Sequence, residues 1–251
     1  KAFHKTILKF GLIKNDGTLK KDMSNWTLYN LHYKGELREA KKKYTLALKS
    51  GDYKFHNSQL IKSNENIKPL HSSHRLLYET IMQLNPQSVF EMGCGTGMHL
   101  RNIQTLLPQA KICGVDLSYQ QLNGLKKNYP QIANNAKQAD ATASWAKLPF
   151  ETCDVAFTQA VIMHIHTGDA HLVALENLFK MARKYIILYE SPKNHPFKTD
   201  IQKLFDEGKI NWANLYFYYR VDEKNNPSGI ICSSTLLNYP ELTGDTFPFK
   251  I

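Results

Sequence analysis

Three acidic side chains that follow apolar runs are the residues of this sequence best suited to hold a ligand. Glu91 and Asp116 each lie at the end of such a run, and Asp140 follows a third, weaker one. Carboxylates can accept hydrogen bonds from hydroxyl and amino groups, or neutralise a cation. The stretch GCGTG at 93–97 follows Glu91 almost directly, and its glycines let the backbone approach a ligand closely because no Cβ obstructs it.

The glycine spacing argues against two common nucleotide sites. A dinucleotide fingerprint reads G-x-G-x-x-G, and Met98 stands where its third glycine belongs, so a dehydrogenase is disfavoured. A phosphate loop of the form G-x-x-x-x-G-K-[ST] does not occur either. Asp116 follows the loop by roughly 20 residues, which suits an acid that accepts hydrogen bonds from both ribose hydroxyls. The other interpretation of Asp116 is a cap for the next helix.

Histidines gather behind the apolar run at 154–161. His164 and His166 follow it directly, His171 is close in sequence, and His195 comes after the next apolar run. Imidazole is the commonest general base, so these are candidates for removing a proton. A packing role for His164 and an exposed loop position for His166 remain the alternatives. The spacing of His164, His166 and His171 matches no strong metal pattern, and no metal is predicted.

The composition is that of a soluble globular protein, with 42% hydrophobic and 22% charged residues in a chain of 251. The longest apolar runs are too short to cross a membrane, and no secretory signal is visible at the N-terminus. The cysteines form no C-x-x-C pair, which favours reduced, buried thiols and a cytoplasmic location. They are Cys94, Cys113, Cys153 and Cys232.

The formal net charge of +10 permits a nucleic-acid partner or an acidic substrate. The lysines are scattered, with one dense run at 41–43 and a looser cluster at 14–21. A solvated basic surface explains such a scattered excess equally well. The charge therefore allows a nucleic-acid partner without requiring one.

The elements that must position these residues begin at about residue 71, where short apolar runs alternate with amphipathic segments. This alternation is typical of β-α units and a parallel sheet. Helices are predicted over 74–84, from the glycine loop to residue 107, and over 119–128, 169–183 and 199–207. Strands are predicted over 88–92, 111–117, 136–139, 154–161, 185–190, 215–221 and 229–234.

The last two strands are joined by a turn-prone stretch at 223–228, so they should be antiparallel. The predicted fold is α/β, with a doubly wound, seven-stranded, mostly parallel sheet that contains one antiparallel strand. Residues 1–70 are expected to form an N-terminal helical arm or lid, with a helix from Glu36 to Lys49 and aromatic residues such as Trp26, Tyr29 and Tyr33. Residues 71–251 are expected to form the ligand-binding domain.

The order and separation of these motifs resemble those of the class I methyltransferases that use S-adenosylmethionine. The resemblance rests on the E-x-G-x-G-x-G loop, on Asp116, and on the run from ADA at 139–141 through LPF at 148–150 to CDVAF at 153–157. It covers roughly residues 71–190, and the terminal strand pair suggests that it extends to about 235. It implies a Rossmann-like fold, S-adenosylmethionine as cofactor and methyl transfer as the reaction.

The resemblance also implies cofactor contacts from four segments of the chain, and these contacts group by the part of the cofactor that each residue would touch. The residues implied for the methionine moiety are Glu91, Gly93, Gly95, Thr96 and Gly97. Those implied for the ribose and adenine are Asp116, Leu117, Asp140 and Ala141. Those implied for the surroundings of the sulfonium are Gln159 and Val161.

The methyl acceptor is less clearly marked. Relatives that methylate exocyclic amines carry [N/D]-P-P-[Y/F] after the fourth strand, whereas this chain reads TQAV at 158–161. An oxygen acceptor would need a base, and His164 and His166 are the candidate catalytic residues. The short chain, without a recognisable RNA-binding appendage, favours a hydroxyl on a small molecule or sugar. RNA or protein methylation is the alternative, and an inactive cofactor-binding scaffold is a third possibility.

Overall fold

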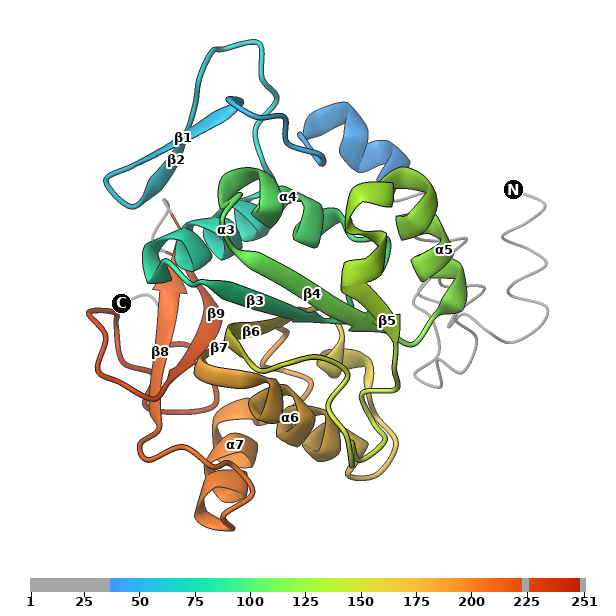
Figure 1. Cartoon of the computed structure of the whole chain (residues 1–251). Coiled ribbons are helices and arrows are strands. Elements are labelled where there is room, and N and C mark those ends of the chain that lie inside the picture. Colours follow the sequence, from blue (N-terminus) through green and yellow to red (C-terminus); the bar gives the residue numbers. More distant parts are fainter. Residues whose placement is uncertain (1–36, 223–225, 249–251) are drawn as a thin grey trace, which may run out of the picture. The chain divides into compact units, whose positions relative to one another are not determined.

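The computed structural model describes residues 37–222 and 226–248 (Figure 1). The predicted aromatic residues Trp26, Tyr29 and Tyr33 therefore lie outside the described residues. The chain divides into two compact units, residues 1–39 and residues 40–251. The sheet and the helices around it belong to the second unit. No helix of the described part is both long and apolar enough to span a membrane.

A seven-stranded sheet forms the centre of the second unit, in the order β5-β4-β3-β6-β7-β9-β8. Only β9 runs against the direction of the other strands of this sheet; it pairs antiparallel with β7 on one side and with β8 on the other. This confirms the predicted mostly parallel sheet with one antiparallel strand. The strands are β3 (Ser88–Met92), β4 (Lys111–Asp116), β5 (Ala136–Gln138), β6 (Cys153–Gln159), β7 (Ala182–Tyr189), β8 (Tyr216–Val221) and β9 (Pro227–Ser233).

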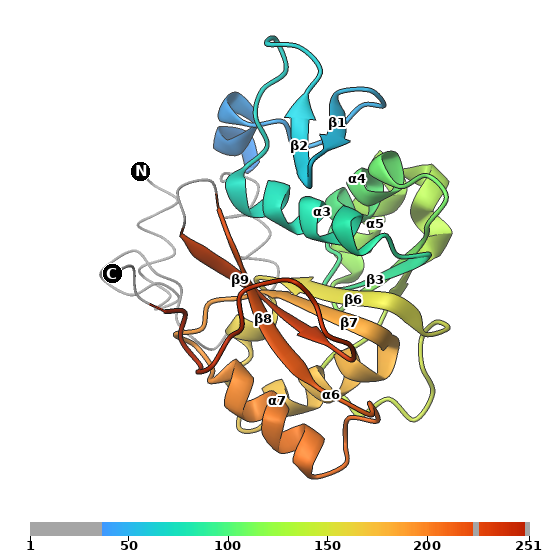
Figure 2. The same cartoon turned by 90° about the vertical axis from the view of Figure 1, so that its left-hand side faces the viewer.

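Helices cover both faces of the sheet, as Figures 1 and 2 show. On one face, Leu77 of α3 and Leu125 of α5 belong to the same apolar core as Val89 of β3. On the other face, Leu178 of α6 and Ile201 of α7 share a second core. The helices are α3 (Ser72–Leu84), α4 (Met98–Leu106), α5 (Tyr119–Asn128), α6 (Ala170–Met181) and α7 (Phe197–Asp206).

The central strands are buried at nearly every position because both of their faces are covered. All of β3 is buried, and so is β6 up to its last residue.

Polar residues mark the ends of the helices. Ser118 caps α5 by accepting a hydrogen bond from the Gln121 backbone N–H, and Asn85 ends α3 in the left-handed conformation. These local signals explain why most element boundaries could be predicted from the sequence.

The region before α3 differs from its prediction. The helix expected from Glu36 to Lys49 extends, among the described residues, only over 37–43. Residues 46–48 are tied instead to Asn102 of α4, which accepts a hydrogen bond from the Leu48 backbone N–H at 2.9 Å and donates one to the Leu46 carbonyl at 2.7 Å. Both leucines are buried. Tertiary hydrogen bonds and burial thus end the helix earlier than its amphipathic pattern predicts.

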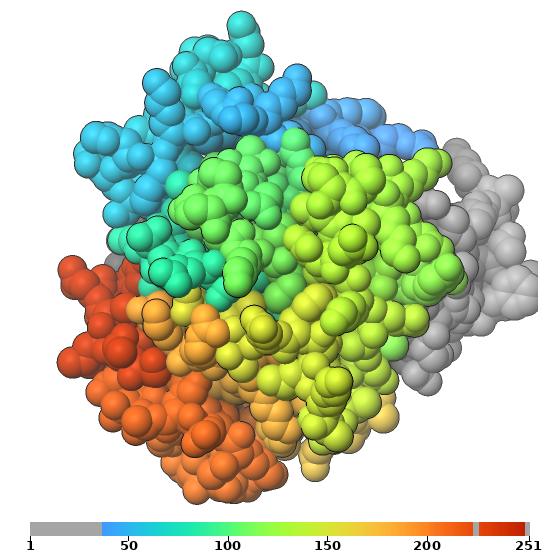
Figure 3. All heavy atoms as spheres, in the orientation of Figure 1, coloured from blue at the N-terminus to red at the C-terminus, as the bar shows by residue number. Residues whose placement is uncertain are grey.

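A hairpin that the sequence analysis did not predict comes next along the chain. It consists of β1 (Tyr53–His56) and β2 (Gln59–Lys62), which pair antiparallel. Its turn contains Asn57 and Ser58 with positive φ angles. The backbone N–H of Leu60 donates to the buried Glu79 carboxylate of α3 at 2.8 Å. Figure 3 shows the hairpin and the preceding residues lying against the helices of this face.

Candidate cofactor site

The glycine loop and Asp116 lie at the carboxyl ends of neighbouring strands. β3 and β4 pair in parallel, with Met92 opposite Val115. The Asp116 carboxylate accepts a hydrogen bond from the Gly95 backbone N–H at 2.8 Å through one oxygen and from the Ser118 backbone N–H at 2.7 Å through the other. It therefore braces both the loop and the start of α5. Burial raises the pKa of Asp116, and the two backbone donors oppose that rise.

Glu91 is almost completely enclosed beside Asp116. Its exposed fraction is 2%, and its Oε2 has no hydrogen-bond partner among the described residues. Burial, followed by the nearby charge of Asp116, raises the pKa of Glu91 well above its usual range, while the Leu100 backbone N–H opposes that rise. A buried carboxylate oxygen without a donor is costly. A cationic ligand group would therefore suit this position.

The three loop glycines have different surroundings, although all have positive φ angles. A Cβ on Gly93 would lie 2.3 Å from Cγ2 of Val161, and one on Gly97 would lie 2.6 Å from Cδ1 of Leu125. A Cβ on Gly95 would meet nothing closer than 3.9 Å. Gly93 and Gly97 thus serve close packing inside the protein, and Gly95 is the glycine beside open space. Thr96 packs its methyl group towards Gly124 of α5, 3.1 Å from the position of an added Cβ.

The adenine-binding residues expected from the sequence lie after the next two strands. Leu117 follows β4, and its side chain is 41% exposed, which leaves an apolar surface for a flat ligand group. Asp140 is exposed in the loop after β5. One Asp140 oxygen, Oδ1, accepts from the Thr142 backbone and hydroxyl at 2.8 and 2.7 Å. No described residue donates to the other oxygen. Ala141, next to it, is partly buried.

The carboxyl end of β6 brings Gln159 and Val161 to the same edge of the sheet. Gln159 Oε1 is buried without a hydrogen-bond partner among the described residues. Glu190, at the end of β7, holds the turn after β6: its carboxylate accepts from the backbone N–H groups of Val161 and Met163 and from the Thr158 hydroxyl, each at about 3.0 Å. Sequence analysis missed Glu190, since nothing in its local pattern distinguishes it from any strand-end acid.

The histidines after β6 and β7 form a stack. The His171 and His195 rings lie 4.2 Å apart at 13°, and His166 and His195 lie 5.5 Å apart at 29°. His171 Nε2 is 3.2 Å from a carboxylate oxygen of Asp200, a residue that the sequence analysis did not single out. Burial, followed by the nearby His166, lowers the pKa of His164. The described part of the chain contains no His, Cys, Asp and Glu group arranged to hold a metal ion.

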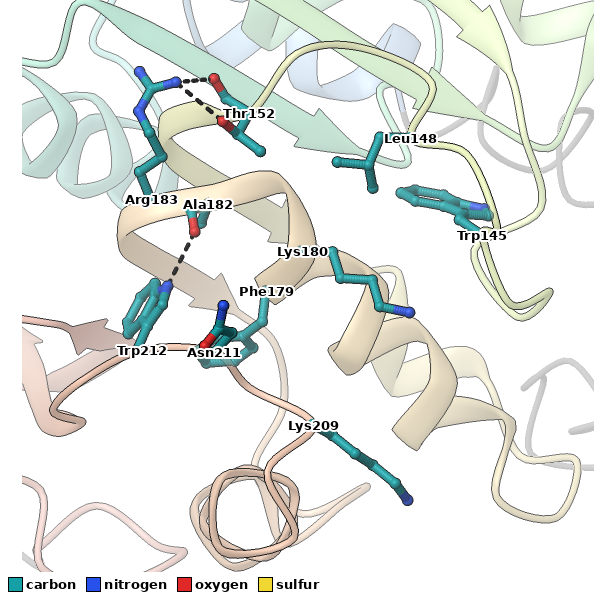
Figure 4. A pocket seen from close by; sticks show the side chains of 10 residues that line it. All are labelled: Trp145, Leu148, Thr152, Phe179, Lys180, Ala182, Arg183, Lys209, Asn211 and Trp212. Atoms are coloured by element: carbon teal, nitrogen blue, oxygen red, sulfur yellow. Dashed lines mark hydrogen bonds between the residues drawn. The ribbon is translucent and has the colours of Figure 1, made fainter.

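A pocket at the opposite edge of the sheet contains none of these residues. It has a volume of about 570 Å³ and lies beside Ala182 and Arg183, which begin β7 (Figure 4). Trp212 lines it and donates its indole N–H to the Ala182 carbonyl at 3.0 Å. Its cations have partners: Arg183 and Asp154 are 3.2 Å apart, for example. In open α/β sheets, ligands bind beyond the carboxyl ends of the strands, so this amino-end pocket is not the candidate cofactor site.

The sheet and its carboxyl edge define a Rossmann-like α/β protein, and acidic residues line the candidate ligand site at the glycine loop. Two buried oxygens without partners among the described residues, Glu91 Oε2 and Gln159 Oε1, lie on strands β3 and β6, which pair directly. Residues 89–184 match the family model described as a methyltransferase domain. Over this segment, which runs from β3 to the start of β7, the chain is therefore similar to methyltransferase domains.

Solved structures with a similar fold include several methyltransferases. The sugar N-methyltransferase KedS8 from Streptoalloteichus is 15% identical, with 48% of each chain covered and a TM-score of 0.40. CalS10, an amino pentose methyltransferase from Micromonospora echinaspora, is 17% identical, with 48% of this chain and 50% of CalS10 covered and a TM-score of 0.40. The match thus spans about half the length of these two enzymes.

The methyltransferase domain of bacterial CtHen1-C is 17% identical, with 64% of this chain and 96% of that domain covered and a TM-score of 0.47. No curated protein sequence matches the chain. Identities this low concern the fold alone, so the acceptor must be argued from this chain's own residues.

Proposed function

We propose that this protein transfers a methyl group from S-adenosylmethionine to a hydroxyl of a small molecule or sugar. The observation that carries the cofactor assignment is the buried Glu91 carboxylate, whose Oε2 has no donor among the described residues, beside the loop that Asp116 braces. S-Adenosylmethionine has a cationic ammonium group for such a carboxylate and an activated methyl group for transfer. The family match of residues 89–184 supports the same assignment.

Each part of that cofactor has a counterpart among the residues expected from the sequence. Glu91 would hold the ammonium group, and Gly95 would leave room for the methionine moiety above the loop. Asp116 would accept from the ribose hydroxyls with the lone pairs that its backbone bonds leave free. Leu117, Asp140 and Ala141 would surround the adenine. Gln159 and Val161 would lie nearest the sulfonium.

The choice of an oxygen acceptor rests on the residues that come directly after β6. The sequence TQAV at 158–161 lacks the pattern that amine-methylating relatives carry, and histidines are next along the chain. His164 and His166 are the candidate bases for the acceptor hydroxyl's proton. Burial lowers the pKa of His164, so its imidazole is neutral near pH 7 and can accept a proton. His166 belongs to the stack with His195.

The experiment that tests the cofactor assignment is titration calorimetry of the full chain with S-adenosylmethionine and S-adenosylhomocysteine. We expect micromolar dissociation constants for both. Asp116→Ala should weaken binding by about 1–3 kcal/mol because the ribose hydroxyls and the loop lose their acceptor. Asp169→Ala is a suitable control, since that exposed aspartate makes no capping hydrogen bond. Failure of the unaltered protein to bind either compound would refute the assignment.

The alternative acceptor is RNA, which a positively charged surface of the protein would bind. The net charge of +10 motivates this alternative. Binding of RNA that weakens steeply as salt rises would favour RNA over a small molecule. Once cofactor binding is established, methyl transfer from labelled S-adenosylmethionine to hydroxylated metabolites, glycans and RNA would decide between these acceptors. His166→Ala would then be expected to lower turnover by about 10²–10⁴ if His166 is the base.

A further inference from the structure

A buried asparagine on α6 directs all of its side-chain hydrogen bonds to the loop that carries Asp140 and Ala141. Asn177 has an exposed fraction of 0% and lies among apolar residues. Its side-chain N–H groups donate to the carbonyls of Ala141 at 2.9 Å and Ala143 at 2.8 Å. Its Oδ1 accepts from the Trp145 backbone N–H at 3.3 Å. A polar side chain within an apolar core is costly unless it is satisfied in this way.

Trp145 adds a second tie to the same loop. Its indole N–H donates to the Asp140 carbonyl at 2.8 Å. Its ring also packs edge-on against Phe90 of β3, with the ring centroids 6.4 Å apart. Asn177 therefore fixes the backbone on both sides of Thr142, and Trp145 fixes the residue whose carboxylate has a free oxygen. The exposed loop is held to the core at several points.

We propose that Asn177 is a positioning residue for adenine recognition: through the backbone of residues 141–145 it sets where Asp140 and Ala141 meet the purine edge. The ligand group concerned is the 6-amino group of a purine, which can donate to the free Asp140 oxygen. This inference rests on the proposed function, because it takes the loop as the adenine site. Asn177 itself touches the loop and not the ligand, so it would act on selectivity rather than on the reacting atoms.

The chain provides a matched control. Asn102 on α4 is also fully buried and also ties a loop to the core, through the Leu46 carbonyl and the Leu48 backbone N–H. Its loop carries none of the residues assigned to the cofactor. Asn177→Leu and Asn102→Leu each remove a buried amide that braces a loop, and both should lower the melting temperature. Only Asn177→Leu should change how the protein reads adenine.

The test compares two ligands, S-adenosylhomocysteine and S-inosylhomocysteine, in which an oxygen replaces the 6-amino group. The unaltered protein and Asn102→Leu should prefer the adenine compound by roughly tenfold or more, since a site built around a hydrogen bond discriminates against ligands that lack it. In Asn177→Leu the preference should fall to within about threefold, mainly through weaker binding of S-adenosylhomocysteine. Asp140→Ala, on the exposed loop, should have the same effect.

Equal weakening of both ligands in Asn177→Leu would overturn the inference, because it would show a structural role alone. Equal affinities in the unaltered protein would also overturn it, since Asp140 would then not recognise the amino group. If Asn177→Leu does not fold, Asn177→Asp decides the matter, because it keeps the size of the side chain and the acceptor for the Trp145 backbone N–H but removes the N–H donors to the Ala141 and Ala143 carbonyls; the same loss of adenine preference is expected. Failure of the unaltered protein to bind S-adenosylhomocysteine would instead refute the proposed function.

Discussion

At the scale of single residues, the candidate site is defined by acids without cationic partners. Glu91 and Asp116 stand at the ends of paired strands, and neither forms an ion pair with a lysine or arginine of the described part of the chain. Two neighbouring carboxylates in a buried place repel each other, and burial further disfavours their charged forms. This arrangement costs stability, and a cationic ligand would offset the cost. Cofactor binding should therefore be coupled to the ionisation of Glu91.

The first prediction concerns the pH dependence of S-adenosylhomocysteine binding. The ammonium group favours ionised Glu91, whereas burial raises the pKa of Glu91 in the free protein. Binding should therefore release a proton below that raised pKa, and affinity should increase as pH rises through it. Calorimetry in two buffers with different ionisation enthalpies measures the protons released. Glu91→Gln should bind more weakly and without this dependence. Proton uptake by the unaltered protein would contradict the assignment of Glu91.

At the scale of elements, the loop after β3 and the turn after β6 are built against each other. Val161 packs on Gly93, and Glu190, the residue after β7, accepts a hydrogen bond of 3.0 Å from the Val161 backbone N–H. Glu190 is 7% exposed, and burial raises its pKa, while its three backbone donors and Thr158 oppose that rise. The ends of three adjacent strands, β3, β6 and β7, are therefore joined into one unit.

The second prediction separates the packing role of one glycine from the ligand-facing role of another. Gly93→Ala and Gly95→Ala both place a side chain at a positive φ, which costs about 1–2 kcal/mol. Gly93→Ala also forces a contact of 2.3 Å with Val161, so it should lower stability further. Gly95→Ala would make only an ordinary contact of 3.9 Å with Gln121 Oε1, so it should mainly weaken S-adenosylhomocysteine binding. Chemical denaturation and calorimetry on both variants measure the two effects.

A different outcome would contradict this prediction. If Gly95→Ala binds S-adenosylhomocysteine as tightly as the unaltered protein, the cofactor does not approach the loop at Gly95. The comparison is internal, because both substitutions add the same methyl group at positions only two residues apart.

At the scale of the whole molecule, residues well before α3 pack against the helices of the seven-stranded sheet. Leu46 and Leu48 are buried and bonded to Asn102, and Leu60 of the hairpin is bonded to Glu79. Arg220 of β8 lies 3.8 Å from the same Glu79 carboxylate. The segment from about residue 44 to the hairpin is thus part of the packed unit that begins at residue 40.

The third prediction places the functional boundary within the N-terminal region by two truncations. Deleting residues 1–36 should leave the folded unit and S-adenosylhomocysteine binding intact, because the described core elements remain. Deleting residues 1–50 also removes the buried side chains of Leu46 and Leu48, and it should lower stability by about 3 kcal/mol or more. Circular dichroism melting and calorimetry check both. Equal stability of the two truncated chains would show that the 46–48 segment contributes nothing to the core.

The sequence alone determined the strands, most of the helices and the residues at the carboxyl edge of the sheet. The positions of Glu91 and Asp116 could be predicted because strands that are buried on both faces appear in the sequence as short, continuous apolar runs, and each acid lies at the end of one. Ser118 and Asn85 mark helix ends for the same local reason. The antiparallel final strand could also be predicted, since two β-rich runs joined by a short turn have few other ways to pair.

Only the tertiary structure decided which residues hold these parts in place. Asn102 bonds the segment where the helix predicted over 36–49 has ended, Glu190 fixes the turn after β6, Asn177 braces the loop after β5, and Asp200 lies beside His171. Each acts on a partner at least 27 residues away in sequence. A single polar residue in an apolar helix or at a strand end leaves no periodic pattern, and its partner becomes known only when the chain has folded.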